Sequence, residues 1–450
     1  MSVDFTIVGA GVSGLTAALV IKDSQPDAKV TIIDAAPVPG GLLKSVEFHK
    51  RDVPLFFDYG THIPQLMADD AMNQLVFPED VTGKWHRLDR LEVGNFFNQK
   101  LNLNSQFVNV STEHPKFCQI LQELLETLPM EEWEDLEDKS LEDFLIHRYG
   151  QTLTDEVFQP LILKMTGAAL CDLTPQTPQF YGLGRVAIGS QLLSENLKKI
   201  PQLDQALAYT EDQPNLRAAT WVYPGEKGVG EWIAFMVDKC QKAGVEFLFN
   251  HKIQSIKQCE NEYQLSLSSQ DVIHSSKLIW TLPFYVGFEG AQNTRFDSRS
   301  IAIYHFTCES PALVKQHYIY CQDAAMESYR ITLYDNLYPK PKDGPYKVTV
   351  EVICDEQAPN EALIRAELQQ MGIFADKEKL EHIGTTSIPY GFPVPLLARQ
   401  AHQLEIYDKV KQENPGVIFA GRGHQGVFFT VDVLNHVYQT LKAIPKRNQT

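Results

Sequence analysis

The stretch Phe5-Thr6-Ile7-Val8-Gly9-Ala10-Gly11-Val12-Ser13-Gly14 decides which fold we expect for this chain. Its apolar residues 5–8 predict a short buried strand, and residues 15–21, which follow the last glycine, predict a helix. A second apolar run, residues 30–33, ends on Asp34, 20 residues beyond the third glycine. A strand, a glycine-rich turn, a helix, a strand and an acid in this order are what a Rossmann-type dinucleotide fold requires.

The three glycines of this turn have different physical roles. Gly9 allows a tight turn off the strand, Gly11 lets backbone amides approach a pyrophosphate, and Gly14 lets the helix pack close to the sheet. The helix N-terminus, at Val12 and Ser13, offers unpaired N–H groups and a partial positive charge to the phosphates. A glycine-rich loop without a ligand is the alternative, but the strand, the helix and the spacing together favour dinucleotide binding.

The acid narrows the choice of dinucleotide. Asp34 is placed to accept hydrogen bonds from ribose hydroxyls. A carboxylate at this position disfavours a 2′-phosphate, so NADP is the least favoured occupant.

Two stretches that follow the acid carry a family resemblance. Residues 35–43 contain a second glycine pair, Gly40-Gly41, and Phe57-Asp58-Tyr59-Gly60-Thr61-His62 comes later. This arrangement resembles the FAD-binding half of the flavin amine oxidase, protoporphyrinogen oxidase and UDP-galactopyranose mutase superfamily. The resemblance implies FAD as the cofactor, with the second glycine pair against its pyrophosphate and ribityl region and His62 close to the flavin ring. From the residues alone, His62 is one of 13 histidines and is equally consistent with a structural role.

The C-terminal segment resembles the mutases most closely. Gly421-Arg422 ends a predicted strand, and Asp432 follows ten residues after the arginine. In UDP-galactopyranose mutases an acid at this interval opens the last helix, whose first backbone amides reach the flavin pyrimidine carbonyl. By this resemblance Val431 and Asp432 would lie at the flavin. The alternative is a glycine-rich strand-to-helix turn with a surface arginine.

Four further residues resemble mutase substrate positions. They are Arg330 in Tyr329-Arg330-Ile331-Thr332, Arg299 in Phe296-Asp297-Ser298-Arg299-Ser300-Ile301, Arg185 in Tyr181-Gly182-Leu183-Gly184-Arg185, and Tyr390 in Ile388-Pro389-Tyr390-Gly391-Phe392-Pro393-Val394-Pro395. The resemblance implies that arginines of this set meet the diphosphate of a nucleotide sugar, a group that suits the bidentate guanidinium. Each arginine on its own is more typical of a structural salt bridge.

The cofactor-binding residues expected from the sequence and the resemblance together form one set, and the catalytic candidates another. The cofactor-binding set is Gly9, Gly11, Val12, Ser13, Gly14, Asp34, Gly40, Gly41, Leu42, His62, Ile253, Gly421, Arg422, Val431 and Asp432, of which Ile253 is expected on the adenine side. The catalytic candidates are His62, Arg330, Arg299, Arg185 and Tyr390.

Length, composition and charge limit the number of domains and the kinds of partner that we expect. A chain of 450 residues with 44% hydrophobic residues suggests two or three domains. The net charge of −17 argues against a nucleic-acid partner and against docking on an anionic membrane. No targeting segment, membrane-spanning run or metal-ligand spacing is recognisable, and the seven cysteines form no C-x-x-C pair. We expect a cytoplasmic enzyme with reduced thiols, a small-molecule substrate and no metal.

The sequence therefore predicts an α/β fold with a Rossmann-like FAD-binding domain. This domain is expected to be discontinuous, formed by residues 1–65, 217–287 and 400–450. Apolar residues at helical spacing predict a mostly helical insertion at 66–216, and alternating apolar residues predict an antiparallel-sheet substrate domain at 288–399.

Three functions fit these features. The leading hypothesis is a mutase-like flavoenzyme that acts on a nucleotide-linked sugar in surface-polysaccharide metabolism. The first alternative is a FAD-dependent oxidoreductase of the amine oxidase or protoporphyrinogen oxidase type, in which the substrate gives hydride to oxidised flavin. Gln65, which stands where the mutases carry a second histidine, leaves room for this alternative and for a third, a catalytically inactive FAD-binding protein.

Overall fold

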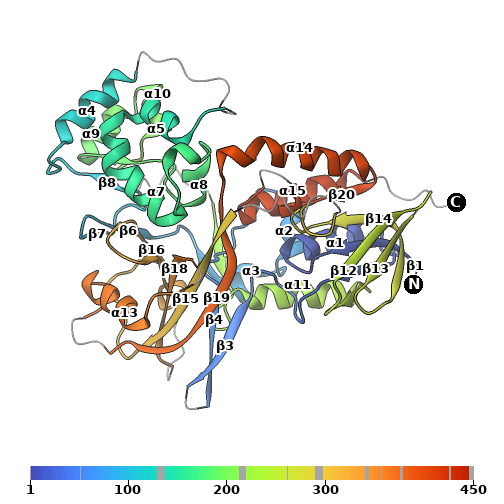
Figure 1. Cartoon of the computed structure of the whole chain (residues 1–450). Helices are drawn as coiled ribbons and strands as arrows, with labels where there is room; N and C mark the ends of the chain where they lie inside the picture. The colour runs from blue at the N-terminus through green and yellow to red at the C-terminus, as the bar shows by residue number, and fades with distance from the viewer. Residues whose placement is uncertain are drawn as a thin grey trace. The chain divides into compact units, whose positions relative to one another are not determined.

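The structure is a computed structural model, and the chain separates into two compact units (Figure 1). Unit 1 comprises Met1–Asp89, Ala219–Arg295 and His402–Thr450, and unit 2 comprises Arg90–Ala218 and Phe296–Ala401. The described residues are 2–50, 52–128, 136, 138–211, 219–260, 262–288, 297–339, 344–355, 357–375, 379–424 and 427–444. No helix among these residues is long and apolar enough to cross a membrane.

Unit 1 is built on a seven-stranded sheet with the strand order β11-β2-β1-β14-β13-β12, in which β20 also pairs with β14. The pairs formed by β11, β2, β1, β14 and β20 are parallel, whereas β12, β13 and β14 pair in antiparallel fashion. The strands are β1 (Ser2–Val8), β2 (Val30–Ile33), β11 (Glu246–Leu248), β12 (Ile253–Gln258), β13 (Tyr263–Leu267), β14 (Val272–Trp280) and β20 (Val417–Phe419). This is the parallel Rossmann-type core that the first forty residues predict.

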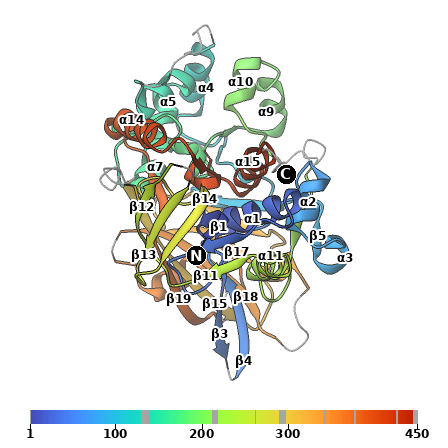
Figure 2. The same cartoon turned by 90° about the vertical axis from the view of Figure 1, so that its right-hand side faces the viewer.

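Helices cover this sheet, and two small strand pairs lie outside it (Figure 2). The helices are α1 (Val12–Ser24), α2 (Asp70–Val76), α3 (Val81–Lys84), α11 (Gly230–Lys242) and α15 (Thr430–Lys442), with a 3₁₀ turn at Gly421–Gly423. The outlying pairs are β3 (Ser45–Lys50) with β4 (Val53–Asp58), and β5 (His86–Leu88) with β10 (Trp221–Tyr223). Residues 13–21 of α1 are all buried, because this helix packs against β1, β2, α11 and α15 and its sequence is apolar or small on every side.

The boundary of unit 1 differs from the one expected at residue 65. Residues 66–89 were assigned to the helical insertion, but they belong to unit 1. The reason is long-range pairing: β5 pairs with β10, and the indole N–H of Trp232 donates to the carbonyl of Val76 at 2.7 Å.

Unit 2 contains a second seven-stranded sheet, in the order β19-β15-β18-β17-β16-β6-β7. The expected antiparallel pairing holds except between β6 and β16, which are parallel. The strands are β6 (Val93–Phe97), β7 (Lys100–Asn102), β15 (Asp297–Cys308), β16 (Tyr318–Cys321), β17 (Ser328–Leu333), β18 (Tyr346–Cys354) and β19 (Glu381–Val394). Because β6 and β7 come from the expected helical insertion, that segment contributes strands as well as helices.

Helices of unit 2 cover one face of this sheet and form a separate cluster (Figure 1). Ile364 and Leu368 of α13, and Met371 directly after this helix, pack on the sheet face that carries Phe306, Ile331 and Val350. The helical elements are α4 (Phe117–Glu126), α5 (Leu141–Tyr149), α6 (Gln151–Leu153), a π-helix (Thr154–Phe158), α7 (Gln159–Thr166), a 3₁₀ turn (Leu170–Asp172), α8 (Thr177–Phe180), α9 (Gln191–Leu197), α10 (Pro201–Ala206), α12 (Tyr334–Leu337) and α13 (Glu361–Gln370), and β8 (Asn109–Val110) pairs with β9 (Ala187–Ile188).

Two long elements were not predicted, β19 and α14 (Leu397–Glu413). Strand β19 contains prolines and a glycine that predict a loop, but it is the edge strand of its sheet, where proline is tolerated. Its register against β15 shifts between Arg299 and Ile301, so residues 389–391 form a bulge. Residues 75–76 form the end of α2.

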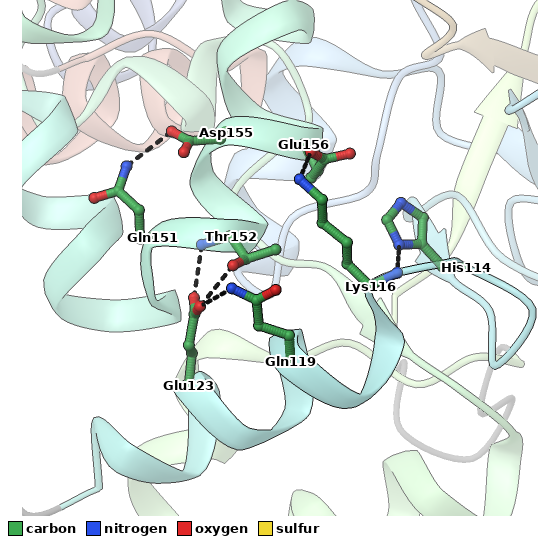
Figure 3. A network of polar contacts seen from close by, with 8 residues as sticks. All are labelled: His114, Lys116, Gln119, Glu123, Gln151, Thr152, Asp155 and Glu156. Carbon is green, nitrogen blue, oxygen red and sulfur yellow. Dashed lines mark hydrogen bonds and ion pairs between the residues drawn. The ribbon is translucent and has the colours of Figure 1, made fainter.

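A carboxylate from a neighbouring helix caps the long helical segment 151–166 (Figure 3). Glu123 of α4 accepts hydrogen bonds from the backbone N–H and the hydroxyl of Thr152, both at 2.6 Å, and from the amide of Gln119 at 2.9 Å. Gly150, with φ of +85°, precedes the helix, and a Cβ there would lie 2.6 Å from the Cβ of Glu123. Burial raises the pKa of Glu123, but the bonds from Thr152 and Gln119 outweigh it and hold that pKa below its usual range.

We predict that Glu123→Gln lowers the free energy of unfolding by about 1–2 kcal/mol, because the helix loses a charged cap. A lowered pKa in the folded state means that the stabilisation is present above the unfolded value of about 4.3 and disappears as the pH falls through the folded value. The variant should therefore lose less stability than the parent between pH 7 and pH 3. Urea unfolding at both pH values measures this, with exposed Glu126→Gln on the same helix as the control. Equal losses in the two variants would contradict the capping role.

Candidate cofactor and substrate sites

The glycine-rich turn after β1 has the geometry that its sequence predicts. Gly9 has φ of +105°, and a Cβ there would lie 2.5 Å from the hydroxyl oxygen of Thr281. A Cβ on Gly14 would lie 1.9 Å from the carbonyl oxygen of Gly9, so the helix can start this close to the strand only with glycine. A Cβ on Gly11 would meet nothing within 4 Å. The turn is therefore tight at its two ends and open at its centre, where a ligand is expected.

Asp34 ties the two βα segments together through its carboxylate. One oxygen accepts the N–H of Ala10 at 2.6 Å, and the other accepts the N–H of Ala36 at 2.8 Å. These bonds fix the acid at the end of β2 beside the glycine turn, and each carboxylate oxygen retains a lone pair for a further donor.

The start of β12 lies beside this acid. The N–H of His251 donates to the carbonyl of Asp34 at 3.0 Å, and that of Asn250 donates to the carbonyl of Ala36 at 3.1 Å. Ile253, the first residue of β12, is thereby held close to Asp34. Its place on the adenine side of a cofactor stays a prediction of the sequence resemblance.

The second glycine motif, Gly40-Gly41, contacts the glycine-rich turn after β1. Gly40 forms a parallel bridge with Gly11, and its N–H donates to the carbonyl of Ala10 at 2.9 Å. Gly41 has φ of +58°, and a Cβ there would lie 3.5 Å from the Cα of Gly11. Leu42, which follows, is exposed. The two glycine motifs, 26 residues or more apart in the sequence, form one backbone-lined surface.

The C-terminal segment returns to the first turn of α1. Gly421 has φ of +60°, and a Cβ there would lie 2.2 Å from the hydroxyl oxygen of Ser13. Helix α15 starts at Thr430, so Val431 and Asp432 lie in its first turn, and it packs along α1. Neither helix has a side-chain cap at its N-terminus. Both helices therefore keep unpaired N–H groups and a partial positive charge at that end.

Arg422 is a half-buried cation next to this junction. Burial lowers the pKa of its guanidinium, which lies 4.7 Å from the centre of the Phe428 ring. Among the described residues, no carboxylate or other acceptor bonds to it. A guanidinium in this position can still donate to an anion.

In the Asp-x-Gly-x-His stretch, Asp58 has a structural role and His62 is partly exposed. Asp58 is buried and accepts the hydroxyl of Tyr223 at 2.6 Å and the N–H of Val229 at 2.8 Å, so it holds the start of α11 in place. His62 is half-buried, with Nε2 3.0 Å from the carbonyl of Tyr59. The structural role of Asp58 was not predicted, because its partners lie more than 160 residues away in the sequence.

Arg330 lies in unit 2, and its charge is compensated locally. On β17 it donates from Nε and Nη2 to the two carboxylate oxygens of Glu351 on β18, each at 2.8 Å. Glu351 is 1% exposed. The guanidinium carbon lies 5.6 Å from the centre of the Tyr329 ring and 6.0 Å from that of Tyr320. Arg330 is thus a rigid fork within an aromatic wall rather than a free cation.

The other substrate candidates do not form one cluster with Arg330. Arg299 pairs with the exposed Asp355 at 2.6 Å, and a Cβ on Gly167 would lie 3.1 Å from its Nη1. Arg185 is exposed on the surface of unit 2. Tyr390 lies in the bulge of β19 and is 61% exposed. Their roles toward a substrate stay predictions. Among the described residues, no group of three or more acidic, histidine or cysteine side chains could hold a metal ion.

Comparisons with known proteins agree with this geometry. Residues 7–76 match the family described as the NAD(P)-binding Rossmann-like domain. A search of curated proteins finds no matching relative.

Solved structures resemble the chain over almost its whole length. Reduced UDP-galactopyranose mutase has a TM-score of 0.72 at 17% identity, covering 98% of this chain and 94% of the other. A provisionally assigned protoporphyrinogen oxidase from Exiguobacterium sp. 255-15 has a TM-score of 0.63 at 14% identity, covering 98% and 97%. A redesigned putrescine oxidase has a TM-score of 0.60 at 13% identity, covering 98% of each chain. The predicted resemblance to this superfamily is confirmed for the fold.

We predict that Gly14→Ala costs about 3 kcal/mol or more of folding free energy, because its methyl group would overlap the carbonyl of Gly9. Gly11→Ala should stay within about 1 kcal/mol of the parent, because its φ of −77° is ordinary and its Cβ is free. Thermal and urea unfolding without added cofactor measure both. Similar losses in the two variants would refute the assigned difference between the glycines.

Proposed function

We propose that the chain is a FAD-dependent enzyme whose cofactor binds to unit 1. The observation that carries this proposal is the junction of the two chain ends: Gly421 packs on Ser13, and the half-buried Arg422 lies beside it. A pyrophosphate there would meet the N–H groups of α1 and the guanidinium. The open side of Gly11 leaves room for it.

Different residues of unit 1 would contact different parts of such a cofactor. Asp34 and Ile253 would hold the adenosine end, and Gly11, Gly40 and Gly41 would lie at the pyrophosphate and ribityl chain. The first turn of α15, with Val431 and Asp432, would direct its N–H groups at the flavin, and His62 is the candidate for a contact at the ring. Bound flavin supplies two-electron or nucleophilic chemistry, and this chain's residues bind and orient it.

We predict that Arg422→Met weakens FAD binding by about 10- to 100-fold, because a charge-assisted contact to the pyrophosphate is lost. Flavin fluorescence quenching during titration of apoprotein with FAD measures the affinity. Arg87→Met is the matched control, since Arg87 is an exposed arginine of the same unit that pairs with Asp89. The parent protein remaining colourless in excess FAD would reject the cofactor assignment altogether.

For the substrate, we propose a nucleotide-linked sugar converted in a mutase-like reaction of surface-polysaccharide metabolism. The similarity to UDP-galactopyranose mutase supports this proposal. So does the fixed guanidinium of Arg330: Glu351 orients it, and Nη1 makes no hydrogen bond among the described residues. That nitrogen could donate to a diphosphate leaving group, and Tyr320 and Tyr329 could flank it.

A second candidate is an oxidase of the amine or porphyrinogen type. The observation that favours it is the charge balance at Arg330, because the pair with Glu351 leaves an aromatic wall with little net positive charge. Such a wall suits an apolar or cationic substrate better than a diphosphate.

One comparison separates the two candidates. A mutase predicts that UDP-sugars bind more tightly to dithionite-reduced than to oxidised protein and are isomerised without net oxidation. An oxidase predicts flavin reduction and hydrogen peroxide on adding amines or porphyrinogens to oxidised protein under air. FAD binding with neither outcome would leave the catalytically inactive alternative.

We predict that Arg330→Lys weakens UDP binding about 10-fold and leaves FAD affinity unchanged, because lysine keeps the charge opposite Glu351 but loses the fork. Lysine is preferred to alanine here, since alanine would leave the buried carboxylate of Glu351 without its cationic partner. Calorimetric titration with UDP measures the effect, and Arg365→Lys, whose arginine pairs with Glu361 on α13, serves as the control. Unchanged UDP affinity would count against the diphosphate site.

A further inference from the structure

Unit 2 contains a polar pocket that the proposed function does not use. Its volume is about 430 Å³, within the range of small-molecule sites. It lies between the β6–β7 hairpin, residues 104–115 and residues 210–211, and five asparagines line it, at positions 95, 98, 102, 104 and 109. An asparagine offers two donors and an acceptor on one rigid plane, so this lining is dense in hydrogen-bonding groups without carrying charge.

Two of these amides are anchored to the backbone. The Asn95 amide nitrogen donates to the carbonyls of Ser105 and Phe107, at 2.8 and 2.7 Å. The Asn109 amide nitrogen donates to the carbonyl of Gly189 at 3.3 Å. Asn95 is almost fully buried, so the backbone fixes the direction of its side chain. The orientation of both amides is therefore set before any ligand arrives.

A third amide keeps its donor groups available. The Asn102 side-chain oxygen accepts the N–H of Asn104 at 3.0 Å, and its amide nitrogen donates to no group among the described residues. The pocket therefore offers the amide donor of Asn102 beside two amides that the backbone holds in place. A hydroxyl group both donates and accepts, so neighbouring hydroxyls match such a set.

The pocket has few charged side chains. Lys100 pairs with Glu113 at 2.6 Å, and the remaining ionisable lining residues are His114 and Glu211, so apart from His114 the lining holds two carboxylates and one lysine. Among the lining residues, no arginine and no unpaired lysine is present to hold a phosphate. Phe97 supplies one partly exposed aromatic side chain, which can cover the apolar C–H face of a sugar ring.

We propose that this pocket is a binding site for a neutral carbohydrate of one or two sugar units. The site is built entirely from unit 2, so it depends neither on FAD nor on the flavin chemistry proposed above. Asn95 is in register with Tyr320, which is in register with Arg330. The pocket thus begins two strands, or about 10 Å, from Arg330 on the same sheet face.

The test is a ligand screen on the FAD-treated full-length protein. Saturation-transfer NMR with glucose, galactose, N-acetylglucosamine, lactose and maltose identifies a binder, and calorimetry measures its affinity. Saturable binding in the millimolar range or tighter is expected for at least one sugar. Asn102→Ala and Asn109→Ala should each weaken it about 5- to 10-fold, the effect of one lost amide contact. Asn196→Ala, an exposed asparagine of α9 outside the pocket, should leave it unchanged.

The outcomes separate this proposal from its competitors. Absence of saturable binding by all five sugars would overturn it, as would binding that both pocket variants leave intact. Uridine is the decisive competitor: uridine binding weakened by Asn102→Ala and Asn109→Ala, with no effect on sugars, would assign the pocket to a nucleobase instead. Thermal unfolding of each variant shows whether a loss of binding merely reflects a loss of the fold. Failure of the FAD titration would leave the sugar result untouched, so the two proposals can fail separately.

Discussion

The close approach of backbone at the first turn of α1 is the constraint on which unit 1 depends. Gly14 lets the helix start against the carbonyl of Gly9, and Gly421 lets the C-terminal segment pack on Ser13. Both contacts are shorter than any side chain would allow. They bring Arg422 and the N-terminus of α1 to one location, although Ser13 and Gly421 are about 400 positions apart in the sequence. N–H dipoles and a guanidinium at one location favour an anion there.

Unit 2 follows a different principle, since its charged groups are compensated locally. Arg330 bonds to Glu351, and Glu367 accepts the N–H groups of Glu327 and Ser328. Lys164 donates to three backbone carbonyls in the same region. These charged groups are therefore paired within the unit, and their hydrogen bonds fix the directions of their side chains.

The shared fold constrains the nucleotide-binding core more closely than the groups that would meet a substrate. A mutase, an assigned protoporphyrinogen oxidase and a putrescine oxidase all align with about 98% of this chain at 13–17% identity. At this identity the common fold accounts for the glycine turn, the acid and the returning C-terminal segment. It does not decide the reaction, because the groups that meet a substrate vary on a constant scaffold.

The sequence by itself determined the Rossmann-type core, because strand, glycines, helix and acid interact over fewer than 35 residues and each has a local physical reason. It also predicted the helix that follows the third glycine, observed as α1 (Val12–Ser24). Only the tertiary structure decided that Asp58 supports α11, that β19 is an edge strand in spite of its prolines, and that Arg330 is neutralised by Glu351. Those features arise from partners distant in the chain, and burial and charge compensation become visible only when the partners meet.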